Sequence, residues 1–250
     1  MKPKPVPDGG DVWLAGVDGC KAGWVAVMRN RTDPDNPVLK VFPSFWDILA
    51  ADPFLSIIAV DMPIGLPDFI SPEGRGPEKA ARKHLGERQS SVFTVPSRAS
   101  VYETDYRDAC ATALQTSSPP KKVSKQCFFL FPKIREIDEL MTPELEERVF
   151  EVHPELAFWR LNGGREMSLP KKVKSRPNPD GLDQRRDLLV SKGLPQSFLD
   201  QKPPKGCGRD DLLDAAANSL IAERCLLGQA EPFPTSYRRD ERGLRMAIWA

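Results

Sequence analysis

The sequence predicts an α/β protein in which a five-stranded mixed sheet is flanked by helices. An apolar run at residues 12–17 ends on Asp18, and a glycine-bounded turn then leads into a second apolar run. Residues 55–60 are almost continuously apolar, which is typical of a strand buried on both faces of a sheet. Residues 210–227 predict a long closing helix that stops at Gly228. Together these three segments favour a layered α/β architecture.

The remaining elements follow from apolar spacing and from turn residues. The first three strands are expected at residues 12–17, 22–29 and 38–42, with a hairpin turn at 19–23 and a loop at 32–37. A short helix capped by Ser44 follows, then the strand at 55–60, and a fifth strand is expected at 148–152. Other helices are predicted at 78–85 (stopping at Gly86), 97–114, 134–140, from 155 onward and at 184–191, with a basic loop at 168–181.

This order of elements matches the ribonuclease H-like layout. Strands one to three would form an antiparallel meander, and strands four and five would run parallel to strand one. Helical insertions are expected between strands four and five and before the last helix. Residues 11–250 therefore predict a single domain, and residues 1–10 a disordered tail.

Composition limits the classes of protein that fit. The chain has 250 residues, of which 40% are hydrophobic and 28% charged, as in an ordinary globular protein. Its formal net charge of +1 gives no general attraction to nucleic acid, so any such partner needs a local basic patch. No apolar run approaches the roughly 20 residues of a membrane span. Five scattered cysteines without a C-x-x-C pair argue against a zinc site and a disulfide framework, and indicate a cytoplasmic setting.

Acidic side chains end two predicted strands and open the last helix. In the predicted layout strands one and four are parallel neighbours, so Asp18 and Asp61 should meet at one edge of the sheet. Asp211 and Asp214 are three residues apart and share a helix face, whereas Asp210 points away. Helix-dipole stabilisation would explain Asp210 or Asp211, but not the strand-end acids. We therefore expect Asp18, Asp61, Asp211 and Asp214 to bind Mg²⁺ or Mn²⁺, which prefer oxygen ligands.

A second acidic group lies at the end of the fifth strand. Glu151 and His153 would share a strand face, and Glu155 begins the following helix. His153 has the chemistry of a general base or a metal ligand, and also that of an ordinary buried histidine at a strand end. Glu151 is the stronger candidate for a catalytic role.

Several basic and hydroxyl side chains are candidate contacts to a phosphate-bearing substrate. Arginines flank serines in the segment 88–98, which equally suits a capped loop between helices. Lysines in the long basic loop are candidate backbone contacts, although such a run also suits a solvated loop. The candidate substrate-binding residues are Lys21, Arg88, Ser90, Ser91, Lys133, Arg135, His153, Lys171 and Lys172.

Seven short motifs occur in order along the chain, at residues 16–25, 61–67, 90–93, 132–136, 151–155, 210–215 and 242–246. With them the chain resembles the DUF429 family of predicted ribonuclease H-like nucleases. The resemblance implies a ribonuclease H-like fold and metal-dependent nuclease activity. The acid pattern is also similar to that of Holliday-junction resolvases, which points to Asp18, Asp61, Asp211 and Asp214. The resolvase pattern has glutamate after strand four, where this chain has the shorter Asp61.

The leading hypothesis is a nuclease that hydrolyses DNA or RNA with two metal ions. Asp18 would bridge the ions, Asp61 and Asp214 would each bind one, and Asp211 or Glu151 would complete the site. A non-catalytic module that binds nucleic acid or protein is the first alternative. The second is an ATP-binding protein related to actin and the sugar kinases, for which Gly163-Gly164 and Gly206-Cys207-Gly208 are poor substitutes for the expected glycine-rich loops. The run at 246–249 would pack internally or form a homodimer contact.

Overall fold

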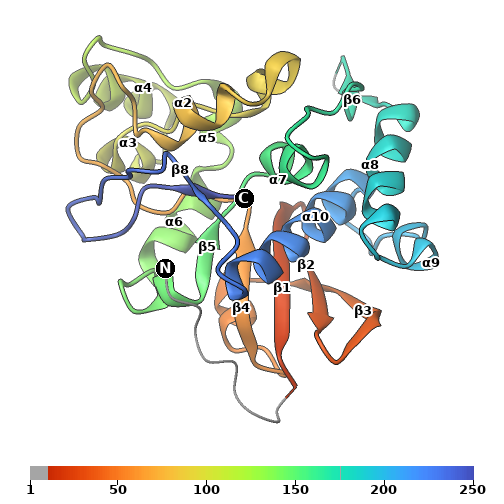
Figure 1. The fold of residues 1–250 in the computed structure, drawn as a ribbon. Coiled ribbons are helices and arrows are strands. Elements are labelled where there is room, and N and C mark those ends of the chain that lie inside the picture. Colours follow the sequence, from red (N-terminus) through yellow and green to blue (C-terminus); the bar gives the residue numbers. More distant parts are fainter. Residues whose placement is uncertain (1–10, 175) are drawn as a thin grey trace.

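The computed structural model describes residues 11–174 and 176–250 (Figure 1); the predicted tail at 1–10 lies outside these residues. Its centre is a mixed sheet with the strand order β3-β2-β1-β4-β5. β1, β2 and β3 pair antiparallel, and β4 and β5 run parallel to β1. The predicted fold class is therefore confirmed. The strands are β1 (Trp13–Cys20), β2 (Gly23–Asn30), β3 (Asp33–Phe42), β4 (Leu55–Val60) and β5 (Val149–Glu151).

Helices make up most of the two segments that come before and after β5 in the chain (Figure 1). After α1 (Phe45–Leu49) and β4, the first insertion contains α2 (Pro77–Arg82), η1 (Gly86–Ser91), α3 (Arg98–Tyr102), α4 (Tyr106–Gln115), α5 (Lys125–Phe128), α6 (Phe131–Leu140) and η2 (Leu145–Glu147). The second contains α7 (Pro154–Leu161), the hairpin β6 (Lys172–Val173) and β7 (Arg176–Pro177), α8 (Pro179–Ser191) and α9 (Gln196–Leu199). The chain closes with α10 (Arg209–Leu226) and the hairpin of β8 (Pro232–Phe233) and β9 (Ile248–Trp249).

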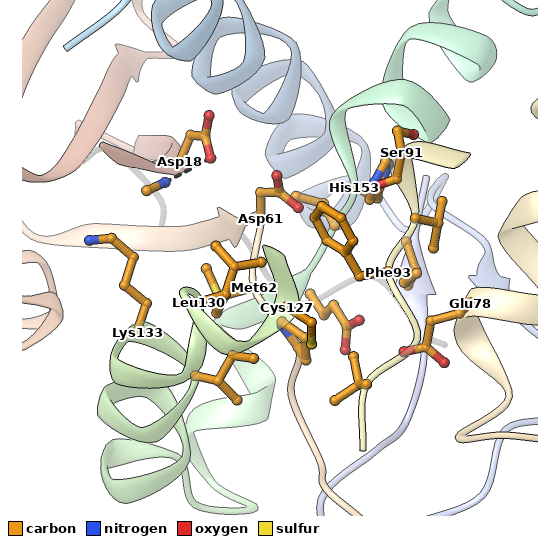
Figure 2. Close-up of a pocket in the computed structure, with 18 residues that line it drawn as sticks. Asp18, Asp61, Met62, Glu78, Ser91, Phe93, Cys127, Leu130, Lys133 and His153 are labelled. Carbon is orange, nitrogen blue, oxygen red and sulfur yellow. Dashed lines mark hydrogen bonds between the residues drawn. The ribbon is translucent and has the colours of Figure 1, made fainter. Parts of the chain in front are cut away.

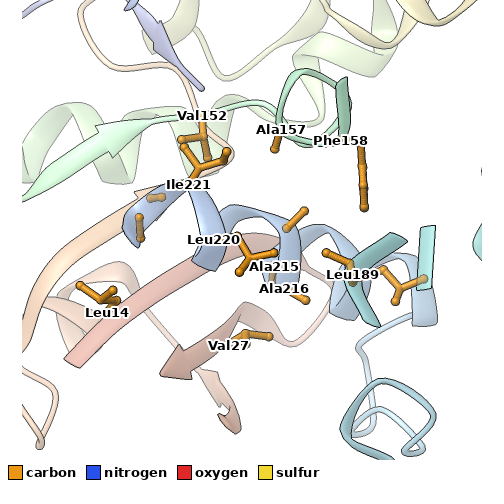
Figure 3. Packing of buried hydrophobic residues seen from close by; sticks show 14 of the residues in the cluster. Leu14, Val27, Val152, Ala157, Phe158, Leu189, Ala215, Ala216, Leu220 and Ile221 are labelled. Carbon is orange, nitrogen blue, oxygen red and sulfur yellow. The ribbon is translucent and has the colours of Figure 1, made fainter. Parts of the chain in front are cut away.

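Helix α10 is buried on nearly all sides. Its residues are mostly small or apolar around the whole circumference, a pattern typical of a helix inside the core. It lies between the sheet, represented by Leu14 and Val27, and the layer of α7 and α8, represented by Phe158 and Leu189 (Figure 3). The other face of the sheet is covered by α1 and by helices of the first insertion.

Gly16 allows α10 to lie directly on β1. A Cβ atom at this position would come within 2.0 Å of the Ser219 backbone nitrogen and 2.1 Å of the Ala215 carbonyl oxygen. These are backbone atoms, so no side-chain movement would relieve the overlap. A glycine in the middle of a buried strand is thus explained by close approach of the helix, which fixes α10 beside the end of β1.

The third strand is longer than the sequence predicts. The prediction of a loop at 32–37 is wrong, because β3 begins at Asp33. Pro34 and Pro37 cannot donate hydrogen bonds to a sheet, and they are tolerated here because β3 is an edge strand with mostly exposed residues.

Several helix boundaries also differ from prediction, and the helix predicted at 134–140 begins at Phe131. The helix predicted at 97–114 is two helices, since Asp105 caps a new start by accepting backbone N–H groups of the following turn. The helix predicted at 78–85 ends three residues early, and Gly86 opens η1 rather than capping α2. The helix predicted from residue 184 begins at Pro179, because proline is favoured in the first turn. The predicted cap at Ser44 is confirmed.

The C-terminal run packs inside the molecule. Met246 and Trp249 are 3% and 6% exposed, and the Trp249 ring meets that of Phe150 edge-on at 5.4 Å. Of the two roles expected for residues 246–249, the structure therefore shows internal packing.

In the part of the chain that the structure describes, no helix has both the length and the apolar composition to span a membrane.

Candidate functional site

Two aspartates lie side by side where the central parallel strands end. Gly16 pairs with Ala59 and Val17 with Val60, so Asp18 and Asp61 are the next neighbours in register. The Asp61 backbone N–H donates to the Val17 carbonyl at 3.0 Å. Side chains alternate along a strand, and the residues two before each aspartate face α10. The predicted meeting of the two strand ends is confirmed, and both positions are on the α10 side of the sheet.

Helix α10 brings a third carboxylate to the same place. Asp214 is 2% exposed and lies one residue before Ala215, whose carbonyl contacts Gly16. One turn further along, Asn218 Nδ2 donates to the Val17 carbonyl at 3.1 Å and ties the helix to the end of β1. The close helix–strand packing thus places Asp214 beside Asp18 and Asp61.

Lys171 is the lysine that pairs with this group of acids. Lys171 forms an ion pair and hydrogen bond with Asp214 Oδ2. Burial alone would lower the pKa of Lys171, but the charges of Asp214, Glu155 and Asp18 raise it. Lys171 is therefore a permanent cation at neutral pH. Three carboxylates facing one ammonium group carry two negative charges in excess when all are ionised.

Burial, together with repulsion between the acids, raises the pKa of each aspartate. Burial, reinforced by the charges of Asp61 and Asp214, raises the pKa of Asp18 well above its usual range. Burial likewise raises the pKa of Asp61 to about 7 and that of Asp214 to about 6, in both cases against the opposing charge of Lys171. Carboxyl groups that titrate near neutral pH are typical of functional sites, although ion-pair networks also produce them.

The donor set fits a hard divalent cation. All three groups are carboxylates, and Asp214 Oδ1 is buried without a hydrogen-bond partner among the described residues. Within those residues, however, no three acidic, histidine or cysteine side chains already stand in the arrangement that holds a metal ion. The Lys171 ammonium group supplies the positive charge in this structure. Asp18, Asp61 and Asp214 are the residues that would hold Mg²⁺ or Mn²⁺.

The other two acids of α10 are engaged at its first turn. Asp211 Oδ2 accepts the Gly208 backbone N–H at 2.8 Å and so caps the helix, and burial raises the pKa of this carboxyl. Asp210 pairs with Lys172 at 2.6 Å, and this contact lowers its pKa although burial opposes the shift. Asp211 stays within electrostatic range of Asp18. Both residues lie in the first turn, where the helix dipole favours them, and Asp211 also caps the helix.

Glu151 belongs to a different environment. Its neighbours Phe150 and Val152 pack on the α10 side of the sheet, so Glu151 points to the opposite side. There it pairs with the fully buried Arg75, which also binds Glu78 at 2.8 Å. The Ile64 backbone N–H donates to Glu151 at 2.8 Å. Burial raises its pKa to about 7 against the pull of Arg75. These bonds occupy the carboxylate in a structural network.

A pocket of about 190 Å³ opens beside Asp18 and Asp61 (Figure 2). Figure 2 shows the two aspartates on one side of it, with Met62, Leu130 and Phe93 around its interior. Of the other predicted site residues, Ser91, Lys133, Glu151 and His153 also line it.

Lys133 and His153 have defined positions in the pocket wall. The Lys133 side chain packs against Gly19. Its Nζ donates to the Gly23 carbonyl and lies 4.3 Å from the centre of the Trp24 ring. His153 Nε2 is 3.4 Å from the Ser91 carbonyl, and its Nδ1 is buried without a partner among the described residues. Burial lowers the pKa of His153 to about 4, so the imidazole is neutral at physiological pH.

The remaining predicted contacts lie outside the pocket lining. Lys21 is exposed at the β1–β2 turn, and Arg88 and Ser90 lie in η1. Arg135 donates to the carbonyls of Val101 and Glu103, which gives it a structural role.

Sequence reasoning missed the arginines that neutralise buried acids and the true partner of Lys171. Arg75, Arg185 and Lys171 come from loops or from other helices, and no local spacing links them to Glu151, Glu155 and Asp214. The sequence predicts Lys171 and Lys172 only as candidate substrate contacts in a basic loop, and no local signal pairs them with Asp214 and Asp210.

The fold and the acids at the strand ends define an α/β protein of ribonuclease H-like layout with a buried carboxylate cluster. The chain belongs to the family described as "Protein of unknown function (DUF429)", whose model matches residues 16–239. No curated protein and no solved structure gives a match to this chain.

Proposed function

We propose that this protein is a metal-dependent phosphodiesterase that hydrolyses nucleic acid. The observation that carries the proposal is the set of three buried carboxylates, Asp18, Asp61 and Asp214, for which Lys171 is the one paired cation among the described residues. Uncompensated buried charge is costly, and a protein retains it where a cation or a reacting group uses it. The five free cysteines favour a cytoplasmic location for this activity.

Each residue has a role that follows from its position. Bound Mg²⁺ or Mn²⁺ would supply Lewis acidity to the scissile phosphate. The charges of Asp61 and Asp214 both act on Asp18, so these three carboxylates are the ones that would hold the cation together. Lys171 would leave Asp214 when a cation binds, and its ammonium group would then be available to a phosphate oxygen. Lys133, at the pocket wall, is a second phosphate contact.

The direct test is cleavage of labelled single-stranded, duplex and branched oligonucleotides, as DNA and as RNA, with Mg²⁺, Mn²⁺ or EDTA. We expect cleavage by the wild type with metal and none with EDTA. Asp18→Asn should reduce the rate by at least about 1,000-fold, because metal-held charge contributes several kcal/mol to such reactions, while circular dichroism stays unchanged. Full cleavage by folded Asp18→Asn would overturn the assignment.

One observation favours a second candidate, a non-catalytic module that binds nucleic acid or protein. Lys171 already pairs with Asp214, so part of the site is neutralised without a metal. A wild-type protein that binds oligonucleotides without cleaving any of them in Mg²⁺ or Mn²⁺ would support this second function.

A further inference from the structure

The pocket beside the aspartates is apolar over most of its wall. Asp18 and Asp61 lie at one side, and the remaining surface includes the segment after β4, the segment after η1, helix α6 and the C-terminal strand β9. Figure 2 shows Met62, Phe93 and Leu130 in this part. Its apolar lining residues are Met62, Val92, Phe93, Val95, Leu130, Ile134 and Ile248. Binding of a sugar-phosphate backbone alone is electrostatic and does not require an apolar surface.

The size of the pocket limits what it can hold. Its volume of about 190 Å³ is below the roughly 300–1,000 Å³ of sites for drug-sized ligands. A single heterocyclic ring system is therefore a better fit than a folded ligand or a nucleic-acid strand. Phe93 is half-buried, so part of its ring is held by the core and part is available to a ligand.

One polar group in the wall is unused. His153 Nδ1 is buried without a partner among the described residues, whereas the Cys127 thiol donates to the Thr94 carbonyl and Glu78 is bound by Arg75. In a neutral imidazole one nitrogen donates and the other accepts; Nε2 donates to the Ser91 carbonyl, so Nδ1 is a hydrogen-bond acceptor. An apolar pocket with a single unpaired polar atom is suited to a flat, uncharged ring that carries hydrogen-bonding groups on its edge.

We propose that this pocket receives one unpaired nucleobase of the substrate, with Phe93 against its face and His153 at its edge, while the adjoining phosphate meets Asp18 and Asp61. The choice of ligand rests on the proposed nuclease function. A base inside a continuous duplex cannot enter such a pocket, so the preferred substrate has a bulged, flipped or single-stranded nucleotide at the cleavage position.

The experiment uses full-length Asp18→Asn protein and duplexes, in DNA and in RNA, that carry the fluorescent base 2-aminopurine either bulged or paired. An abasic bulge serves as a third probe. We expect a fluorescence change and about tenfold tighter binding for the bulged base, since stacking on one aromatic side chain has this order of effect. Adding Phe93→Leu should abolish both, and Phe93→Tyr should retain them. Phe129→Leu is the matched control, because Phe129 is 75% exposed and outside the pocket.

Equal affinity for bulged, paired and abasic probes, or no effect of folded Phe93→Leu, would overturn the base pocket. Cleavage by the wild type is scored separately. Metal-dependent cleavage without base preference would leave the nuclease and remove the pocket, whereas base-specific binding without cleavage would do the reverse.

Discussion

Buried carboxylates in this protein fall into two groups with opposite surroundings. In the first group each acid is paired with an arginine. Glu151 and Glu78 share Arg75, and Asp138 and Asp240 share Arg98. Arg185 Nη2 donates to both carboxylate oxygens of Glu155, at 2.7 and 2.8 Å. Where β1 and β4 end beside α10, Asp18, Asp61 and Asp214 have no arginine partner among the described residues; Lys171 pairs with Asp214 and offsets the charge of the other two.

The two groups differ in what they leave unsatisfied. Guanidinium groups match carboxylates with two parallel hydrogen bonds and complete their coordination. A lysine is a point charge, and it leaves Asp214 Oδ1 without a partner among the described residues. The arginine-paired acids therefore hold the fold together, and Asp18, Asp61 and Asp214 are the acids that we propose take part in chemistry.

The largest effect is expected from breaking an arginine-paired group. Arg75→Met should lower the free energy of unfolding by about 3–5 kcal/mol, because it leaves Glu151 and Glu78 buried without a cation. Thermal unfolding measures this as a fall in Tm of roughly 6–20 °C. Arg107→Met, at an exposed position, should change Tm by about 1 °C or less. Equal Tm values for the two variants would contradict a structural role for the arginine network.

A smaller effect is expected from Lys171→Met. In EDTA it should lower the free energy of unfolding by about 2 kcal/mol, since the aspartates lose their counter-charge but can still take up protons. With Mn²⁺ the variant should recover and bind the ion more tightly than the wild type in calorimetry. Lys172→Met, which removes a half-exposed ion pair with Asp210, should cost about 0–1 kcal/mol and leave Mn²⁺ affinity unchanged. Weaker Mn²⁺ binding by Lys171→Met would show that the lysine does not compete with the metal.

The smallest change in Tm, taken per pH unit, is expected for Asp61→Asn. The pKa of Asp61 is about 7 in the native protein and ordinarily 3.8, so the native state keeps a proton that the unfolded state releases between these values. The contribution of Asp61 to stability therefore falls as pH rises from about 4 to about 7. Asp61→Asn removes this loss, so its Tm relative to wild type in EDTA should rise within that window by about 2–4 °C, or on the order of 1 kcal/mol, for each pH unit. Asp35→Asn, on exposed β3, should show no trend; a flat profile for both would contradict the raised pKa.

Sequence patterns predicted the backbone of the site better than its charge balance. The strand ends at Asp18 and Asp61 and the spacing of the acids on α10 follow from local periodicity, which is why the meeting of β1, β4 and α10 was predictable. Lys171 and Arg75 reach their partners from 43 and 76 residues away, and long-range pairing leaves no local signal. The strand at 33–37 was missed because its prolines indicate a loop wherever the edge position is unknown.

The central claim is that Asp18, Asp61 and Asp214 form a divalent-cation site. Its most direct test is thermal unfolding of the wild type and Asp18→Asn at about pH 8, in EDTA and in a saturating series of Mn²⁺, with and without an oligonucleotide. We predict that Mn²⁺ raises the wild-type Tm by roughly 5–10 °C at 100 times its Kd, where binding adds about 2.7 kcal/mol, and leaves Asp18→Asn unchanged. No shift in the wild type under any condition, or the same shift in both proteins, would contradict it.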